Sequence, residues 1–358
     1  MLLAEKVENA KQHQLFPWVG FVFLKFDVSV HNNPKSRFTL YTYGDILVEL
    51  STYVETVPMA GQDTTIEGFR MLPGGSAANC AVSAAHLGAK VNQIGVVGQD
   101  SFSKILLDDL SLSEVSTEFI TCVPGTSAFA VIVVDSTGER TMLSYRDIST
   151  TKLTKEITKV CFSSCDYLHV SGYAFQTEHT AQIANNLLIK ARAAGTTTSI
   201  DPSFQFASDD HKSFKSLLEG LDYIFPNQDE AYQMTGESDP TQAALNILDY
   251  GVKCVVVTCG SSDCIIVGET VEGVNRVPSY EVSDPVDSTG AGDGFVGGFL
   301  AARMRGFDVQ QCARIGHAVA ANVVMEFGGH SGSPNTVQLQ QFAGDCEDTD
   351  LLQLIEDM

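Results

Sequence analysis

The most informative part of this sequence is Asp287-Ser-Thr-Gly-Ala-Gly-Asp293, which an apolar, glycine-rich run continues to Leu300. Gly290 and Gly292 allow unusual φ values and a close approach of the backbone to a ligand. We expect a helix to begin here, and the N–H groups in the first turn of a helix have no intrahelical partners. Those donors and the helix dipole attract an anion, and Asp293 would lie beside it.

A carboxylate next to such an anion site is suited to phosphoryl transfer. The backbone N–H groups of Gly290, Ala291 and Gly292 would hold the migrating group, while Asp293 takes the proton of the attacking hydroxyl. The alternative is that Asp293 is only a favourable acidic residue at the start of a packing helix. Asp287 lengthens the motif and favours the catalytic interpretation.

Rival phosphate-binding motifs are absent from the sequence. A dinucleotide fingerprint requires a third glycine at the position that Phe295 occupies. The chain contains no GxxxxGKS or GxxxxGKT loop, and the HRD and DFG signatures of protein kinases are missing too. The P-loop and protein-kinase classes are therefore excluded.

The motif resembles the C-terminal signature of the PfkB, or ribokinase-like, family of carbohydrate kinases. The resemblance covers Phe38 to Pro334. Four further segments, all before the motif, occur in the family's order: Gly44–Glu49, Gly74–Asn79, Asn227–Glu230 and Thr258–Gly260. It implies ATP- and Mg²⁺-dependent phosphorylation of a hydroxyl on a small sugar, and it leaves a K⁺ requirement open. The alternatives are a nucleoside kinase of the adenosine type and a catalytically silent ligand-binding protein on the same fold.

Strand-like and helical segments alternate along most of the chain, which predicts a parallel sheet covered by helices on both faces. The resemblance implies an α/β fold of the ribokinase-like type, a three-layer α/β/α domain with a small β-sheet lid, at residues 38–344. An N-terminal extension at 1–37 would precede it, and an acidic tail at 345–358, expected to fray, would follow.

The strands that begin the domain and form the lid have their own signals. We expect the first strand at Thr39–Leu50, interrupted by a glycine, and lid strands from about 51–72 and 115–147. Within the second lid segment, a turn between Ala128–Val134 and Arg140–Tyr145 predicts a hairpin.

Polar residues near the first strand and the glycine pair are expected to bind the substrate. Gly74 and Gly75 can bring backbone N–H groups close to a hydroxylated ligand, and Asn79 offers both a donor and an acceptor. A carboxylate is costly to bury unpaired, so Glu49, or alternatively Asp45, should meet substrate hydroxyls. The full set is Asp45, Glu49, Gly74, Gly75, Ser76, Asn79 and Arg146, although Arg146 is equally well explained as a solvated strand charge.

A second group of residues is assigned to the nucleotide and metal. Asn227 and Glu230 form a capping-box pattern, and the resemblance implies that they also organise Mg²⁺ and phosphate. By the same resemblance the nucleotide meets Asn227, Thr258, Gly260, His317 and Gly329, with metal ions near Glu230 and Asp287. His317 has the alternative of being a packing residue on its helix.

Charge and cysteine usage limit the partners. The chain has 358 residues and a formal net charge of −22, so nucleic acid and anionic membrane are poor partners. Its nine cysteines include no Cys-x-x-Cys pair and favour reduced thiols in a cytoplasmic protein. The apolar stretch Leu15–Leu24 is too short to span a bilayer. Because lids of relatives often pair between subunits, the expected assembly is a homodimer through the lid.

Overall fold

The computed structural model describes residues 38–66, 68–136, 140–146, 160, 162–207, 217–268 and 271–358. All of them belong to the unit Lys35–Met358. The predicted N-terminal extension and part of the turn of the hairpin lie outside the described residues.

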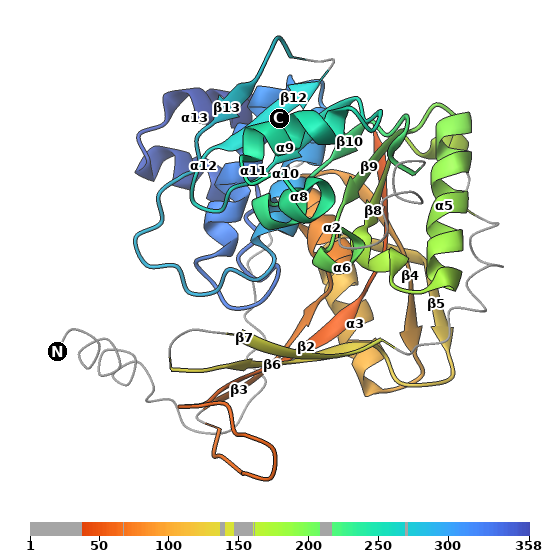
Figure 1. Cartoon of the computed structure of the whole chain (residues 1–358), viewed down its shortest axis with the longest axis vertical. Coiled ribbons are helices and arrows are strands. Elements are labelled where there is room, and N and C mark those ends of the chain that lie inside the picture. The colour runs from red at the N-terminus through yellow and green to blue at the C-terminus, as the bar shows by residue number, and fades with distance from the viewer. Residues whose placement is uncertain are drawn as a thin grey trace. The chain divides into compact units, whose positions relative to one another are not determined.

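A nine-stranded sheet forms the centre of this unit, in the order β13-β12-β11-β10-β9-β8-β1-β4-β5 (Figure 1). Neighbours from β11 to β5 are parallel, as predicted, but β12 and β13 run antiparallel. Only a short turn separates β11 from β12, and a parallel neighbour would need a longer crossover. The strands are β1 Thr39–Tyr43, β4 Lys90–Gly98, β5 Ser116–Val123, β8 Tyr167–Ser171, β9 Thr197–Asp201, β10 Tyr223–Ile224, β11 Cys254–Val257, β12 Cys264–Gly268 and β13 Asn275–Val277.

Helices cover both faces of this sheet and confirm the three-layer fold. Alternate residues of β11 enter different cores: Val256 packs with α2, α10 and α11, and Val255 packs with α5, α8 and α9. In Figure 1, α5 and α11 lie on opposite sides of the sheet. The helices are α2 Ser76–His86, α3 Ser101–Leu112, α5 Glu178–Ala193, α6 Phe204–Ala207, α8 Gln228–Thr235, α9 Pro240–Leu248, α10 Ala291–Arg303 and α11 Val309–Val323, with 3₁₀ turns η2 Phe162–Ser164 and η3 Gly172–Phe175.

The glycines inside α10 are packing residues. A Cβ at Gly297 would lie 2.6 Å from the Cβ of Ser83 on α2, and one at Gly298 would lie 2.8 Å from a methyl group of Val319 on α11. Because these positions lack side chains, α10 fits between α2 and α11, and the N-terminus of α10 is held by two neighbouring helices.

A second sheet of four strands, β3-β2-β6-β7, forms the small lid (Figure 1). Its strands are β2 Leu47–Tyr53, β3 Gly68–Gly74, β6 Phe129–Val134 and β7 Arg140–Tyr145. The pairing of β6 with β7 is antiparallel, which confirms the predicted hairpin. The segment at 115–123 differs from the expectation, because β5 joins the large sheet instead.

The predicted first strand is in fact two strands that belong to different sheets. The chain leaves the large sheet after β1 and enters the small sheet at β2, with Gly44 at the crossing. A Cβ at Gly44 would lie 2.8 Å from the Cβ of Ser171 and 2.9 Å from the Cβ of Ala77. The apolar character of the whole segment hid this break, because both sheets bury their part of it.

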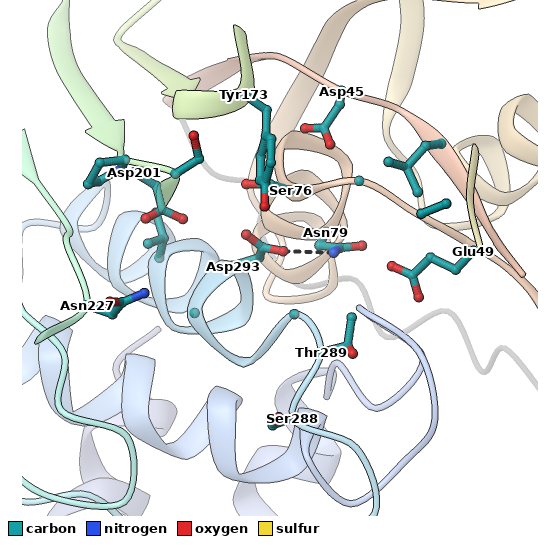
Figure 2. Close-up of a pocket in the computed structure, with 18 of the residues that line it drawn as sticks. Asp45, Glu49, Ser76, Asn79, Tyr173, Asp201, Asn227, Ser288, Thr289 and Asp293 are labelled. Carbon is teal, nitrogen blue, oxygen red and sulfur yellow. Dashed lines mark hydrogen bonds between the residues drawn. The ribbon is translucent and has the colours of Figure 1, made fainter. Parts of the chain in front are cut away.

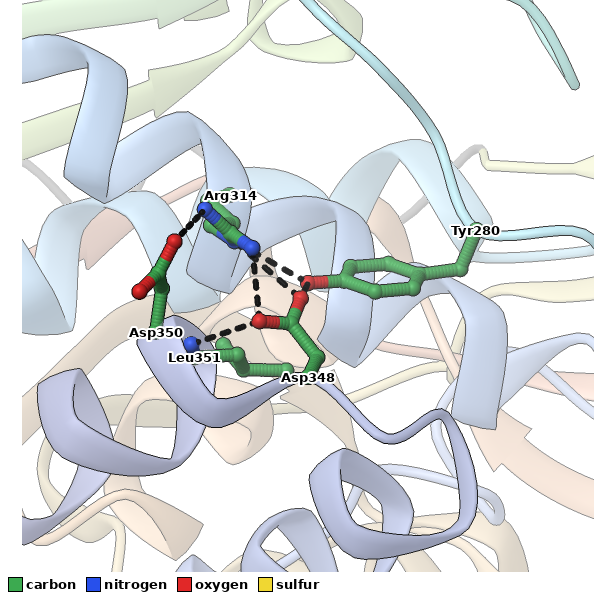
Figure 3. Close-up of polar contacts among 5 residues, drawn as sticks. All are labelled: Tyr280, Arg314, Asp348, Asp350 and Leu351. Carbon is green, nitrogen blue, oxygen red and sulfur yellow. Dashed lines mark hydrogen bonds and ion pairs between the residues drawn. The ribbon is translucent and has the colours of Figure 1, made fainter.

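The acidic C-terminal segment is helical rather than frayed. Helix α12 covers Thr336–Asp345 and α13 covers Thr349–Glu356, where Leu351 and Ile355 are buried. Arg314 of α11 binds Asp348 at 2.6 Å, and the hydroxyl of Tyr280 donates to the same carboxylate at 2.7 Å (Figure 3). The spacing of the apolar residues provides a helical face that outweighs the acidic composition. Among the described helices, none is long and apolar enough to cross a membrane.

Candidate active site

A pocket of about 340 Å³ opens between the carboxyl ends of the large-sheet strands and one face of the small sheet. In open α/β sheets, ligands commonly bind beyond the carboxyl ends of the strands. The large sheet supplies Asp201 at the end of β9 and Thr258 after β11, and the small sheet supplies Glu49 and Ile132. The N-terminus of α10 forms another part of the wall.

The start of α10 is built for close contact with a ligand. Its N-cap is Gly290, which has φ 75° and carries no side chain to cap the first turn. A Cβ at Gly290 would overlap the carbonyl oxygen of Gly329, so a side chain there is excluded by both conformation and space. Gly290, Gly292 and Asp293 all line the pocket, so the helix presents its uncapped N-terminal turn to it.

Asp293 lies near the middle of the pocket in Figure 2 and is held there by a neighbouring amide. The side-chain nitrogen of Asn79 donates to Oδ2 of Asp293 at 2.8 Å. Desolvation of the carboxyl raises its pKa to about 7, and hydrogen bonds from Asn79 and Ser76 partly oppose that rise. A carboxyl with this pKa is suited to accept a proton near neutral pH.

Four further carboxyls line the pocket with Asp293: Asp45, Glu49, Asp201 and Glu230. Burial raises the pKa of Glu230 to about 8, and the negative charge of Asp293 adds to the rise. The hydrogen bond from the backbone of Asn227 partly opposes it. Burial, followed by the charges of Glu230, Asp293 and Asp45, raises the pKa of Asp201. Mutual repulsion among these carboxyls disfavours their ionised forms, and a bound cation would relieve it.

Asn227 and Glu230 cap a helix and also line the pocket. Asn227 caps α8 and accepts hydrogen bonds from the backbone of Asp229 and Glu230. One oxygen of Glu230 accepts from the backbone N–H of Asn227 at 2.9 Å, which completes the capping box. Both residues also line the pocket, so capping fixes Glu230 in position beside Asp293.

Asp45 and Glu49 both reach the pocket but have different surroundings. Asp45 pairs with Arg146 at 2.6 Å, and Arg146 stacks on the ring of Tyr173 at 4.4 Å. Among the described residues, the second, buried oxygen of Asp45 has no hydrogen-bond partner. Glu49 is buried, and its pKa is raised to about 7 chiefly by that burial. Its carboxyl fills the space that a side chain at Gly74 would need.

Comparison with known proteins agrees with this geometry. A sequence profile described as pfkB family carbohydrate kinase matches residues 38–336. The chain belongs to this family. The kinase is 30% identical to an uncharacterized sugar kinase of Archaeoglobus fulgidus, over 71% of this chain and 98% of that protein. It is 29% identical to ribokinase of Mus musculus, over 81% of this chain and 90% of that protein.

Solved structures share the fold of the kinase. An E. coli protein solved in complex with ATP and Mg²⁺ superposes with a TM-score of 0.74 at 24% identity, covering 86% of this chain and 99% of that one. A nucleoside kinase of Methanocaldococcus jannaschii superposes with a TM-score of 0.71 at 21% identity, covering 86% and 98%. The ribokinase-like α/β fold and a phosphotransferase activity are therefore established for the chain.

The kinase places most of the predicted site residues in one pocket. Those that line it are Asp45, Glu49, Gly75, Ser76, Asn79, Arg146, Asn227, Glu230, Thr258, Gly290, Gly292 and Asp293. Sequence reasoning missed Asp201 and Tyr173, which come from β9 and from η3. A polar residue at the end of a buried strand was the available signal for Asp201, whereas Tyr173 had none.

Six predicted residues lie away from the pocket lining: Gly74, Ala291, Gly260, His317, Gly329 and Asp287. His317 is buried against Phe295, and burial lowers its pKa to about 4. Gly260 follows β11 with φ 60° and has open space where a side chain would be. Gly329 packs against the amide of Asn79. Asp287 accepts from the N–H and hydroxyl of Thr289, at 2.9 and 2.7 Å, and from the N–H of Gly328 at 3.1 Å.

Proposed function

We propose that this kinase transfers the γ-phosphoryl group of ATP to a hydroxyl group of a small sugar or sugar-like substrate, with Asp293 as the general base. The observation that carries the proposal is the position of Asp293. It lies in the uncapped first turn of α10, is held by Asn79 at 2.8 Å, and has its pKa raised to about 7. Anion-binding donors and a proton acceptor are thus adjacent.

The acceptor hydroxyl would approach Asp293 from the side of the small sheet. The unpartnered oxygen of Asp45 and the carboxyl of Glu49 are acceptors for further hydroxyls of the substrate. Asp293 takes the proton from the attacking hydroxyl as its oxygen bonds to phosphorus. N–H groups around Gly290 to Asp293 stabilise the charge on the transferring group, so positioning and electrostatics supply the acceleration.

The carboxyls of the pocket fit Mg²⁺ bound with phosphate. Glu230 and Asp201 lie in the pocket with raised pKa values, which a cation would relieve. No cluster of three or more metal-ligating residues occurs among the described residues, and Mg²⁺ usually takes one or two carboxylates together with water and phosphate. When bound, the ion neutralises charge on the phosphates.

The structure gives less support to K⁺ beside Asp287. Three protein donors already hold its two carboxyl oxygens and tie the motif to the loop at Gly328. We therefore assign Asp287 to the organisation of this loop, and no step depends on K⁺.

The adenine end of ATP would lie beyond Thr258. Gly260 leaves open space at the end of β11, and Nε2 of His317 is buried without a partner among the described residues. These features support a nucleotide that extends from α10 along the loop after β11, with Asn227 at the phosphates.

A panel of acceptors tests the function. ADP release would be measured with ribose, fructose, 2-keto-3-deoxygluconate and adenosine in a coupled assay. We expect turnover with a sugar, because most of the labelled side chains of the pocket in Figure 2 carry carboxyl or hydroxyl groups, which can bind the hydroxyls of a sugar. Turnover with adenosine alone would support a nucleoside kinase, and binding without turnover of any acceptor would support the silent alternative.

We further propose a homodimer that forms through the lid. The pocket face of the small sheet carries Glu49 and Ile132, while the opposite face carries the exposed side chains of Phe69, Met71 and Leu143. Exposed apolar patches of this kind usually mark protein contacts. Leu143→Lys should shift the mass in sedimentation equilibrium from dimer to monomer, and Leu112→Lys, at an exposed leucine on α3, should leave it unchanged. A monomeric wild-type protein would refute the dimer.

A further inference from the structure

His330 lies in the loop after α11 and is buried, with 6% of its side chain exposed. Its ring connects two other residues: Nδ1 lies 2.7 Å from Oδ1 of Asn79, and Nε2 lies 3.0 Å from Oδ2 of Asp109 on α3. Asn79 in turn donates to Asp293 at 2.8 Å. A continuous chain of hydrogen bonds, Asp109–His330–Asn79–Asp293, therefore reaches the base from the opposite side of α2.

When Asp293 and Asp109 are ionised, the chemistry of the four groups fixes the direction of every bond in this chain. An ionised carboxylate can only accept, so the NH₂ of Asn79 must face Asp293 and its oxygen must face His330. Nδ1 of His330 must then donate to Asn79. Nε2 faces the carboxylate of Asp109 and must donate as well. Both ring nitrogens of His330 therefore act as donors in this arrangement.

We propose that His330, held as an imidazolium by Asp109, is a positioning residue that orients the amide of Asn79 toward the catalytic base Asp293. This inference rests on the proposed function, because it assigns a role to Asp293. If the amide were reversed, its oxygen would face the carboxylate of Asp293, and the two acceptors would repel each other. His330 prevents that reversal because it supplies a donor to the oxygen end.

Another observation supports a fixed amide. A Cβ at Gly329 would overlap the side chain of Asn79, so the loop that carries His330 packs directly against that amide. The titratable groups that face the ring are Asp109 on α3, Glu49 on β2, Asp293 on α10 and His86 on α2.

Two matched substitutions separate the two bonds of the ring. The amide nitrogen of an asparagine can occupy the place of Nδ1, whereas that of a glutamine can occupy the place of Nε2. His330→Asn therefore keeps the donor to Asn79, and His330→Gln keeps the donor to Asp109. We expect kcat to fall about 10- to 100-fold in the Gln variant and only about 3-fold in the Asn variant. KM for ATP should stay unchanged in both.

The state of the ring is measured separately, by ¹⁵N NMR of histidine-labelled protein, with the Asn variant identifying the His330 signals. Two protonated ring nitrogens at pH 7 are expected in the wild-type protein, and only one in Asp109→Asn. A neutral ring in the wild-type protein would overturn the proposal. So would equal kcat values in folded Asn and Gln variants, because a purely structural role would lower stability alike in both.

The two arms also distinguish this proposal from the proposed function. If the wild-type protein phosphorylates none of the acceptors, the function fails, and the NMR spectra still decide whether the relay exists. Thermal unfolding of each variant shows whether it folds. Asp109→Asn changes the most exposed end of the chain of hydrogen bonds, where 26% of the side chain is exposed, so folding should tolerate it better than a change of the buried ring.

Discussion

The two ends of the pocket are built in different ways. The phosphate end centres on one contiguous motif at the start of α10, and this helix is fixed between α2 and α11 by glycine packing. The substrate end combines Asp45, Glu49 and Arg146, which come from the crossing between the sheets and from two different lid strands or their ends. Chemistry common to a family can therefore be read from a short motif, whereas acceptor choice depends on how separate elements meet.

The largest effect is expected at the phosphate end, with Asp293→Asn. The variant keeps the shape and the contact to Asn79 but loses the proton acceptor, so kcat should fall by about 10³-fold or more while ATP still binds. Asp308→Asn, at the N-cap of α11, is the control and should keep normal kcat. Near-normal turnover by a folded Asp293→Asn protein would remove Asp293 from the mechanism.

A backbone change in the same region should have the next largest effect. In Gly290→Ala the new methyl group overlaps the carbonyl of Gly329, so the first turn of α10 must move, and kcat should fall about 100-fold. Gly306→Ala is a matched control, because Gly306 has φ 90° but open space around its Cβ position. If both variants lose only stability and by the same amount, the contact with Gly329 has no catalytic importance.

The pH profile measures the base directly. A raised pKa means that Asp293 is ionised above about pH 7 and loses its charge as the pH falls through that value. At pH 6, kcat/KM should accordingly be about 10-fold lower than at pH 8. Glu49 also has a pKa raised to about 7, so the pH profile of Glu49→Gln shows which of the two carboxyls causes the fall of kcat/KM at acidic pH. If kcat/KM no longer falls at acidic pH in that variant, the titrating group is Glu49 rather than Asp293.

The substrate end should respond more weakly and in a different parameter. Arg146→Ala leaves the charge of Asp45 unpaired, so KM for the sugar should rise about 10-fold with a smaller change in kcat. Arg146→Lys keeps the charge but not the planar stacking on Tyr173, and an intermediate KM is expected. An unchanged KM in both variants would support the interpretation of Arg146 as a solvated strand charge.

Local signals predicted much of the fold. The hairpin of β6 and β7 was predicted because a turn separates two strand-like segments. The helix at α10 was predicted because glycines and Asp293 mark its start. Antiparallel β12 was missed, because whether two buried strands run the same way depends on the connection between them rather than on their apolar residues.

The site could be predicted only where one segment carries it. Asp293, Asn79 and Glu230 stand in recognisable motifs, and the structure brings them to the same pocket. His330 carries no local pattern, and Asp201 has only its place at the end of a buried strand; the surroundings of both arise from contacts across large sequence separations, such as that of His330 with Asn79. Such residues are distant in the sequence and become neighbours only in the folded chain.

The crossing at Gly44 makes Asp45 part of a hinge. Only Gly44, Asp45 and Ile46 separate β1 of the large sheet from β2 of the lid, and a second covalent link runs from β3 through Gly75 into α2. Any rotation of the lid against the large sheet must bend these two links together with the connections from β5 to β6 and from β7 to β8. Asp45 would move with such a rotation, so the side chain proposed to bind the substrate would also change position when the lid opens or closes.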